Sequence, residues 1–305
     1  TKENVLNIIK QYGYEPNYFA QNIKTGKSNT LGLIIGDIEN PFYSRLAKGV
    51  INVAETSNYN VIVCNSNYNP KLGEKYLNML IKKGVDGILI ATIDVSNDAI
   101  NNLNKRNIPY VLVTRKSEEE NGNYFIADDY LGGRMASEYL IKLGHKKIFF
   151  LRSADVLGAN ERLRAFKDTM KENNIFFDDS YISKILTNAE DAYSATIEFI
   201  EETRSKEFTA LIGGNDFIAM GAMDAIIDKG LSIPKDLSLI GYDNLWVAKI
   251  LKVALTTIRQ PKMQFGQMST ERLLEMIKNP ELKKYPQKII LKPDLVIRNS
   301  CKKIN

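Results

Sequence analysis

The sequence has few of the residues that form disulfides or hold metal ions. Its 305 residues include two cysteines, Cys64 and Cys301, and one histidine, His145. A disulfide framework needs several paired cysteines, and a zinc site needs a cluster of thiolates or imidazoles. We therefore expect no metal and no other cofactor, and a cytoplasmic location. His145 lies between a predicted helix and a predicted strand, where we expect a structural role.

Long hydrophobic runs are missing too. No stretch reaches the roughly 18 apolar residues of a membrane span, and residues 1–17 are typical of an amphipathic helix rather than of a leader with a cleavage site. The net charge of +5 is spread along the chain without a long basic run. Charge alone thus permits a nucleic-acid partner without requiring one, and we expect no membrane partner.

The common enzyme motifs are also absent. The sequence contains no G-x-G-x-x-G after its first predicted strand, no G-x-x-x-x-G-K-[ST] and no G-x-S-x-G. The adjacent carboxylates Asp128 and Asp129 are not paired with a nucleophile in the sequence. We therefore expect a protein that is not an enzyme.

What the chain does contain is a regular alternation of short apolar runs and helix-length amphipathic stretches from residue 31 onward. This alternation is typical of βαβ units, and the chain is long enough for two of the resulting cores. The sequence predicts an α/β fold of two doubly wound lobes with parallel sheets. Helices are expected at residues 41–57, 70–83, 96–106, 129–143, 159–172, 190–203, 216–229 and 261–278, and a weaker strand at 180–186. The two short strands after residue 278 are expected to cross back and complete both lobes.

Polar and aromatic side chains follow five of the predicted strands. Ligands of such folds bind beyond the carboxyl ends of the strands. Carboxylates and guanidinium groups can bind vicinal hydroxyls, and aromatic rings can cover an apolar ring face, so the set predicts a site for a small polyol or heterocycle. Its members are Phe42, Tyr43, Arg115, Arg162, Asn215, Asp216, Asp243, Asn244 and Trp246.

Each of these residues also has a simpler interpretation. Asn215 could be only the N-cap of the helix that it opens, and Asp243 could be only a turn residue. Arg115 and Arg162 could form surface ion pairs. Trp246 could cover the cleft or lie on the surface of its lobe. The site hypothesis depends on all five strand ends meeting in one place.

Eight segments in chain order resemble the LacI/GalR family of bacterial transcription regulators, whose core is similar to periplasmic sugar-binding proteins. The segments are "GYEPNYFAQNIKTGKSNTLGLII", "NPFYSRLAKGV", "VDGILI", "ADDYLGGRMASEYLIKLGHKKIFFL", "ERLRAF", "GGNDFIAMGAMDAIIDKGLSIPKDLSLIGYDN", "LTTIRQP" and "LVIRNS". The resemblance implies an effector site between the lobes, formed by Phe42, Tyr43, Arg115, Asp128, Asp129, Arg162, Asn215, Asp243, Trp246 and Gln260.

The resemblance also explains the polar segment before the first strand. It implies that residues 1–16 are the last helix of a DNA-binding headpiece and that residues 17–30 are a hinge helix and linker. In this family the hinge helix folds when two copies meet in the minor groove of the operator. The residues implied in DNA binding are Asn17, Ala20, Ile23 and Lys24. Without the preceding helices of the headpiece, we expect no direct reading of the major groove.

We therefore expect an N-terminal lobe at residues 31–145 plus 261–289 and a C-terminal lobe at 146–260 plus 290–305. The implied function is that of an effector-binding and dimerisation core of a transcriptional regulator, most often a repressor. Its expected partners are a sugar, sugar acid or sugar phosphate, operator DNA, and a second copy of the chain. The alternative is a solute-binding protein of a sugar transporter, which would share the fold and the cleft.

Overall fold

A computed structural model of the chain describes residue 11 and residues 27–91, 96–117, 122–153, 156–186, 188–202 and 207–304. The expected hinge residues Asn17, Ala20, Ile23 and Lys24 lie outside the described residues. The headpiece helix expected at residues 1–16 does too, except for residue 11. None of the helices in the described ranges is long and apolar enough to cross a membrane.

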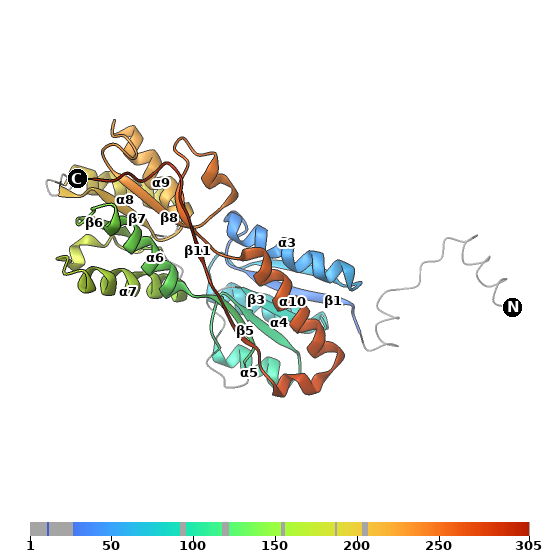
Figure 1. Ribbon diagram of the computed structural model, residues 1–305. Helices are drawn as coiled ribbons and strands as arrows, with labels where there is room; N and C mark the ends of the chain where they lie inside the picture. Colours follow the sequence, from blue (N-terminus) through green and yellow to red (C-terminus); the bar gives the residue numbers. More distant parts are fainter. Residues whose placement is uncertain are drawn as a thin grey trace.

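The described chain forms two lobes, each built on one sheet that is covered by helices on both faces (Figure 1). The sheet of the first lobe is parallel throughout, in the order β10-β5-β4-β3-β1-β2. Its strands are β1 (Thr30–Ile35), β2 (Asn60–Asn65), β3 (Gly87–Ala91), β4 (Tyr110–Val113), β5 (Tyr124–Ala127) and β10 (Lys288–Leu291). Its helices are α3 (Pro41–Thr56), α4 (Pro70–Lys82), α5 (Asn97–Lys105), α10 (Lys262–Lys278) and the 3₁₀ turn η4 (Pro280–Lys284).

The second lobe repeats this design with a sheet in the order β11-β9-β8-β7-β6. Only β11 runs antiparallel to its neighbour. The strands are β6 (Ile148–Leu151), β7 (Ala210–Gly213), β8 (Ser238–Asp243), β9 (Thr256–Arg259) and β11 (Asp294–Val296). The helices are α6 (Asp129–Lys142), α7 (Val156–Glu172), α8 (Ala189–Glu201) and α9 (Asp216–Asp228), with the 3₁₀ turns η1 (Asp179–Tyr181) and η3 (Trp246–Lys249).

The apolar strands are buried because helices pack on both faces of each sheet. In β1, Leu31 and Leu33 belong to the core under α3 and α10, whereas Ile34 belongs to the core under α4 and α5. This alternation follows the two-residue period of a strand. It explains why the strands read as continuous apolar runs in the sequence.

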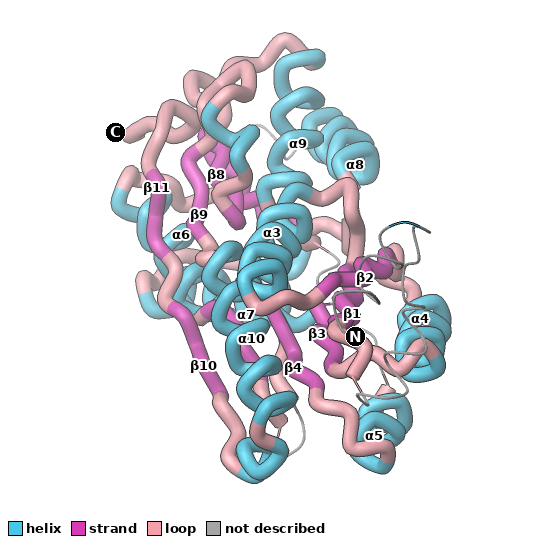
Figure 2. Tube along the Cα trace, turned by 90° about the vertical axis from the view of Figure 1, so that its right-hand side faces the viewer, coloured by secondary structure: helices cyan, strands magenta, loops and turns pink. Residues whose placement is uncertain are grey.

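Three chain segments connect the lobes: β5 to α6, β9 to α10, and β10 to β11. The last connection confirms that the tail completes both sheets. Figure 2 shows β10 and β11 one after the other along the same edge of the molecule. Three crossings at one place allow the lobes to rotate against each other while each sheet stays intact.

Three expectations need correction. The expected first lobe, residues 31–145, includes helix α6, but Ala136 and Leu140 of α6 pack in a core with Ile148 and Phe150 of the second lobe. The first crossing therefore follows β5 and not residue 145. The strand expected at residues 180–186 is a 3₁₀ turn followed by two isolated bridges, at Ile182 and Leu186. Strands β5 and β9, each four residues long, were not among the strands expected from the alternation.

Candidate functional site

The guanidinium group of Arg162, on α7, lines the cleft between the lobes. Its Nε and Nη2 atoms lie 2.9 and 2.8 Å from Oδ1 of Asp129, and its Nη1 donates to the backbone oxygen of Gly214 at 2.8 Å. Its planar face lies 3.7 Å from the ring centre of Tyr242. These contacts hold an arginine that is only 3% exposed in a fixed orientation, with its charge balanced by a carboxylate.

The start of α7 leaves room for this ion pair because residue 158 is a glycine. A Cβ atom on Gly158 would lie 2.7 Å from Oδ2 of Asp129 and 2.9 Å from Nη2 of Arg162. Both distances are too short for a carbon atom. A side chain at this position would therefore push the two charged groups apart.

A second polar group at the base of the cleft is Asp243, at the end of β8. Its Oδ1 accepts a hydrogen bond of 2.6 Å from Nε2 of Gln260, and its backbone oxygen accepts one from Nζ of Lys262. Burial raises the pKa of Asp243, while the nearby charges of Arg162 and Lys262 act in the opposite direction. The carboxyl group of the buried Asp243 is thus bonded to the β9-to-α10 crossing, and its backbone oxygen is bonded to the first residue of α10.

The backbone is strained where two strands enter the cleft. Thr114, after β4, has a φ of 63°, and Asp243 and Asn244 have φ values of 114° and 50°. Such angles are uncommon for residues other than glycine, above all for a β-branched threonine. Strain of this kind clusters at ligand sites, where the surrounding structure fixes the conformation.

Aromatic rings form the wall on the first lobe. The rings of Phe42 and Tyr43 meet edge to face at 5.2 Å, and Tyr68 lies 6.1 Å from Tyr43. Asn40 positions the first two, because its Oδ1 caps α3 by accepting from the backbone nitrogen of Phe42 at 3.0 Å. The cleft therefore combines aromatic rings from one lobe with polar groups from the other.

The structure brings most of the expected site residues together. Those lining the cleft are Phe42, Tyr43, Asp129, Arg162, Asn215, Asp243 and Gln260. Arg115 and Asp128 line an adjoining cavity of about 450 Å³ that shares Thr114 and Asp129 with the cleft. Trp246 does not line the cleft. It is 64% exposed and lies at a separate cavity.

Asn215 and His145 have the structural roles that were considered for them. Asn215 caps α9 through a 2.8 Å bond from the backbone nitrogen of Ile218, in addition to lining the cleft. His145 is fully buried between Thr209 and the backbone of Lys302, at 2.8 and 3.0 Å. Burial lowers its pKa, so the imidazole is a neutral structural group.

Four lining residues are not among those expected from the sequence: Asn40, Tyr68, Thr114 and Ala127. The Asn40–Pro41 pair is a typical helix start, and Tyr68 follows the end of β2, so both could have been found by the rule used for the other strands. The positive φ of Thr114 could not be predicted from the sequence, because β-branched residues such as threonine rarely adopt a positive φ.

Asp216, beside Asn215, is fully buried and forms a support beneath the cleft. Its Oδ1 accepts from Oγ1 of Thr257 at 2.5 Å and its Oδ2 from the backbone nitrogen of Leu245 at 2.7 Å. Burial and, secondarily, the charge of Asp243 raise the pKa of Asp216 to about 7. Asp216 therefore ties the loop after β8 to β9 and to α9.

The cleft is closed. It leaves about 30 Å³ of free space, which is room for about two water molecules. The aromatic wall and the polar groups can enclose a small ring with hydroxyl groups, but only after the lobes move apart. A cleft lined from two lobes that are joined by three crossings defines a two-lobed ligand-binding protein.

The comparisons with known proteins agree with this description. Residues 28–298 match the family described as periplasmic binding proteins and sugar binding domain of LacI family. The transcriptional regulator DegA of Bacillus subtilis is 30% identical over 309 residues, which cover 100% of this chain and 90% of that protein. The transcriptional repressor PurR of Haemophilus influenzae is 32% identical over 310 residues, with the same coverage.

Solved structures show the same relationship. A LacI family transcriptional regulator from Enterococcus faecium with bound ribose is 32% identical, with a TM-score of 0.81 over 90% of this chain and 100% of that chain. The chain belongs to the LacI family of transcriptional regulators. These relatives do not favour the alternative of a transport protein.

Proposed function

We propose that this chain senses a small neutral sugar in the cleft between its lobes and thereby controls the binding of operator DNA. The observation that carries the proposal is the Asp129–Arg162 pair, which faces the rings of the first lobe across the cleft. Polar groups that both donate and accept, opposite an apolar wall, suit a sugar ring. Bound ribose in the Enterococcus faecium relative and in a second relative from Enterococcus faecalis supports the same chemistry.

The charge balance favours a neutral sugar over a sugar acid or sugar phosphate. The cleft contains one cation, Arg162, and two carboxyl groups, Asp129 and Asp243. Arg162 is already paired with Asp129 and bonded to a backbone oxygen. An anionic effector would meet no unpaired positive charge among the residues that line the cleft, whereas hydroxyl groups can donate to the carboxylates.

The effector would act by changing the angle between the lobes. A closed cleft with about 30 Å³ of space must open to admit a sugar, and the three crossings are the hinges. In a dimer this motion would change the spacing of the two segments that precede β1, which lead to the DNA-binding part. The coupling is reciprocal, so DNA would change effector affinity by the same factor.

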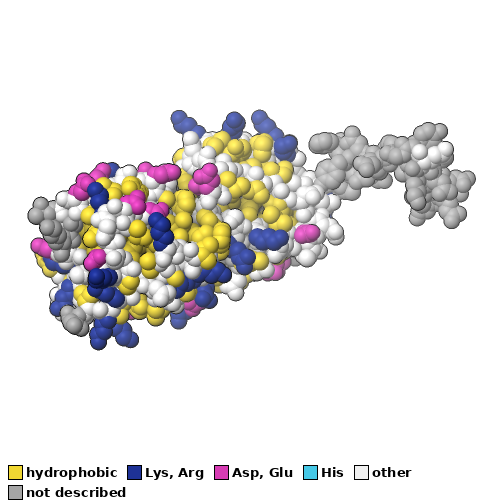
Figure 3. Space-filling view, turned by 90° about the horizontal axis from the view of Figure 1, so that it is seen from above, with side chains coloured by type: hydrophobic (Ala, Val, Ile, Leu, Met, Phe, Trp, Pro, Cys, Tyr) yellow, Lys and Arg dark blue, Asp and Glu magenta, His cyan; other side chains and the backbone are white. Residues whose placement is uncertain are grey.

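We also propose that the chain acts in the cytoplasm as a homodimer, in keeping with the two-fold symmetry of operator sites. Figure 3 looks down on the side that carries α3 and shows hydrophobic side chains along both lobes. Ile51 on α3 is 37% exposed and Ile250 after η3 is 63% exposed. Exposed apolar side chains on both lobes fit a self-complementary interface.

Melting temperatures in the presence of pentoses, hexoses, sugar acids, sugar phosphates and purines test the effector proposal. At a hundredfold excess over Kd, a ligand adds about 2.7 kcal/mol of stability. We expect a neutral sugar to raise the melting temperature of the wild type and of Arg164→Ala, an exposed arginine on the same helix, but not of Arg162→Lys. A shift with an anionic sugar and none with a neutral one would contradict the proposal.

A further inference from the structure

A second and larger cavity lies next to the effector cleft, on the other side of Gln260. Its volume is about 760 Å³, and Gln260 lines both spaces. The walls come from α3, from the start of α10, from the loop after β8 and from the crossing between β10 and β11. The cavity thus touches both lobes, as the cleft does.

The cavity is strongly basic. Its lining holds five cationic side chains and one carboxylate, Asp294, and the cations are Arg45, Lys48, Arg259, Lys262 and Lys292. Within the described part of the chain, Arg45, Lys48, Arg259 and Lys292 form no ion pair within 4.0 Å. Cations concentrated in a concave surface create a positive potential that attracts anions.

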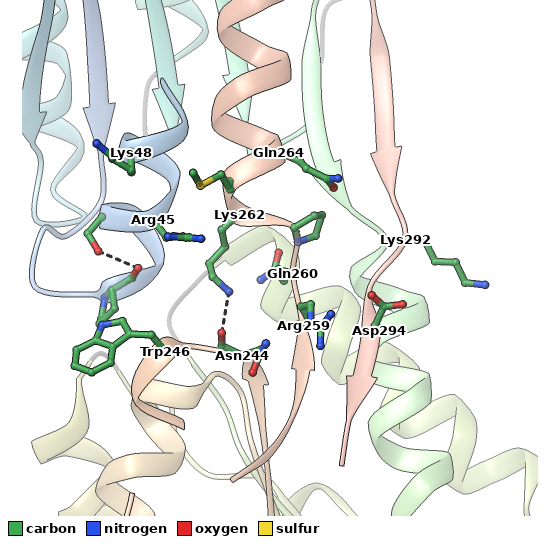
Figure 4. A pocket seen from close by; sticks show the side chains of 14 residues that line it. Arg45, Lys48, Asn244, Trp246, Arg259, Gln260, Lys262, Gln264, Lys292 and Asp294 are labelled. Atoms are coloured by element: carbon green, nitrogen blue, oxygen red, sulfur yellow. Dashed lines mark hydrogen bonds between the residues drawn. The ribbon is translucent and has the colours of Figure 1, made fainter. Parts of the chain in front are cut away.

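Three of the cations surround the middle of the cavity. Figure 4 shows Arg45 extending from α3 toward α10, with Lys262 and Arg259 below it and Lys48 and Lys292 at the two outer ends. Lys262 is only 7% exposed. Burial lowers the pKa of Lys262, and the carboxylates of Asp243 and Asp216 act in the opposite direction. The charges of Arg45 and Arg259 lower it further. A bound anion would relieve this mutual repulsion.

Two long helices also begin at this cavity. Helices α3 and α10 have no acidic residue in their first turns, and α10 has no side-chain cap. The amino ends of helices carry a partial positive charge that adds to the field of the side chains. The indole of Trp246 lies at the rim, below the start of α3 (Figure 4).

We propose that this cavity binds a small molecule with two or more phosphate groups, held between Arg45, Arg259 and Lys262 with its organic part beside Trp246. Guanidinium groups form paired hydrogen bonds to phosphate oxygens, and the indole offers a flat apolar face. The effector cleft lacks this chemistry, since its single arginine is paired. The two sites therefore select different classes of ligand.

The wall between the sites couples them. Lys262 donates to the backbone oxygens of Asp243 and Asn244, and Gln260 donates to the carboxylate of Asp243. A phosphate on Lys262 competes with these carbonyl groups for its ammonium hydrogens. The polyphosphate therefore changes the position of Asp243, which lines the effector cleft.

Trp246 is the single tryptophan of the chain, so its fluorescence reports on this cavity directly. Pyrophosphate and ADP are the probes, titrated at two salt concentrations, with calorimetry as the second readout. We expect saturable binding of both, weakened by salt. The double variant Arg45→Gln/Arg259→Gln, which replaces two exposed side chains, should bind at least about tenfold more weakly.

The matched control is Lys71→Gln/Lys75→Gln, which removes the same charge from exposed positions on α4. It should bind like the wild type. No saturable binding to the wild type, or equal losses in the two double variants, would overturn the proposal. The titration does not depend on the sugar, so it stands or fails separately from the proposed effector.

Discussion

The side-chain amide of Gln260 donates to the carboxylate of Asp243 over 2.6 Å, in the wall that separates the effector cleft from the basic cavity. Gln260 belongs to the crossing from β9 to α10, and Asp243 ends β8. A rotation of the lobes about this crossing would therefore move the amide of Gln260 relative to the carboxylate of Asp243. The pair is a direct link between lobe angle and the shape of the cleft.

Replacing Gln260 by methionine should weaken both folding and effector binding. The variant keeps the volume but leaves the buried carboxyl group of Asp243 without its amide donor, at a cost of about 1–3 kcal/mol. Urea unfolding measures the stability, and calorimetry with the effector measures the affinity. Gln264→Met, an exposed position of α10 in the same cavity wall, should leave both unchanged. Equal behaviour of the two variants would show that the bond to Asp243 is unimportant.

Replacing Arg162 by methionine should destabilise the second lobe strongly. Asp129, whose side chain is 13% exposed, would remain as a nearly buried charge without a partner, which costs about 3–5 kcal/mol. The double variant Asp129→Asn/Arg162→Met removes both charges and should recover part of the loss. Urea unfolding of the two variants checks this prediction. An equal loss in both would mean that packing on Tyr242, and not the charge, holds the site.

The sheets and most of the helices could be predicted because their signals are local. A buried parallel strand is a continuous apolar run, and an amphipathic helix repeats every 3.6 residues. Strand β9, with the sequence TTIR, has one apolar residue and therefore no such run. The side of the crossing on which α6 packs is a tertiary property, decided by the fit of Ala136 and Leu140 to the second sheet.

The candidate site could be predicted as far as the ends of the strands. Seven of the expected residues meet in the cleft, because parallel strands deliver their carboxyl ends to one edge. Trp246 follows the same strand as Asp243, but the strained turn at Asp243 and Asn244 directs the chain away from the cleft. A backbone turn of this kind is not encoded by residue type alone.

Replacing Ile250 by aspartate should weaken the proposed dimer. The side chain is 63% exposed in the single chain, so the change should have little effect on folding stability. In a two-fold symmetric dimer it would bury two aspartates, one from each copy, and weaken association. Sedimentation at several concentrations should show the variant shifted to monomer and the wild type to dimer. Ile185→Asp, also exposed in the second lobe, is the control. A wild type that stays monomeric throughout would refute the dimer itself.

Folding stability should depend on pH through Asp216. Its pKa is about 7 in the folded chain, against an ordinary value of 3.8, because it is fully buried next to Asp243. Between these values the folded chain binds the proton and the unfolded chain does not. The free energy of unfolding therefore falls as pH rises from about 4 to about 7, by up to about 1.4 kcal/mol per pH unit.

The variant Asp216→Asn isolates this contribution. The amide keeps the shape, and its oxygen can accept from the backbone nitrogen of Leu245 while its NH₂ group faces the hydroxyl of Thr257. Urea unfolding across this range should show the wild type losing stability relative to the variant as the pH rises, with no further change above about 7. If the two stability curves ran parallel from pH 4 to 7, Asp216 would be ionised throughout, and its carboxylate would have to be stabilised by the charge of Lys262.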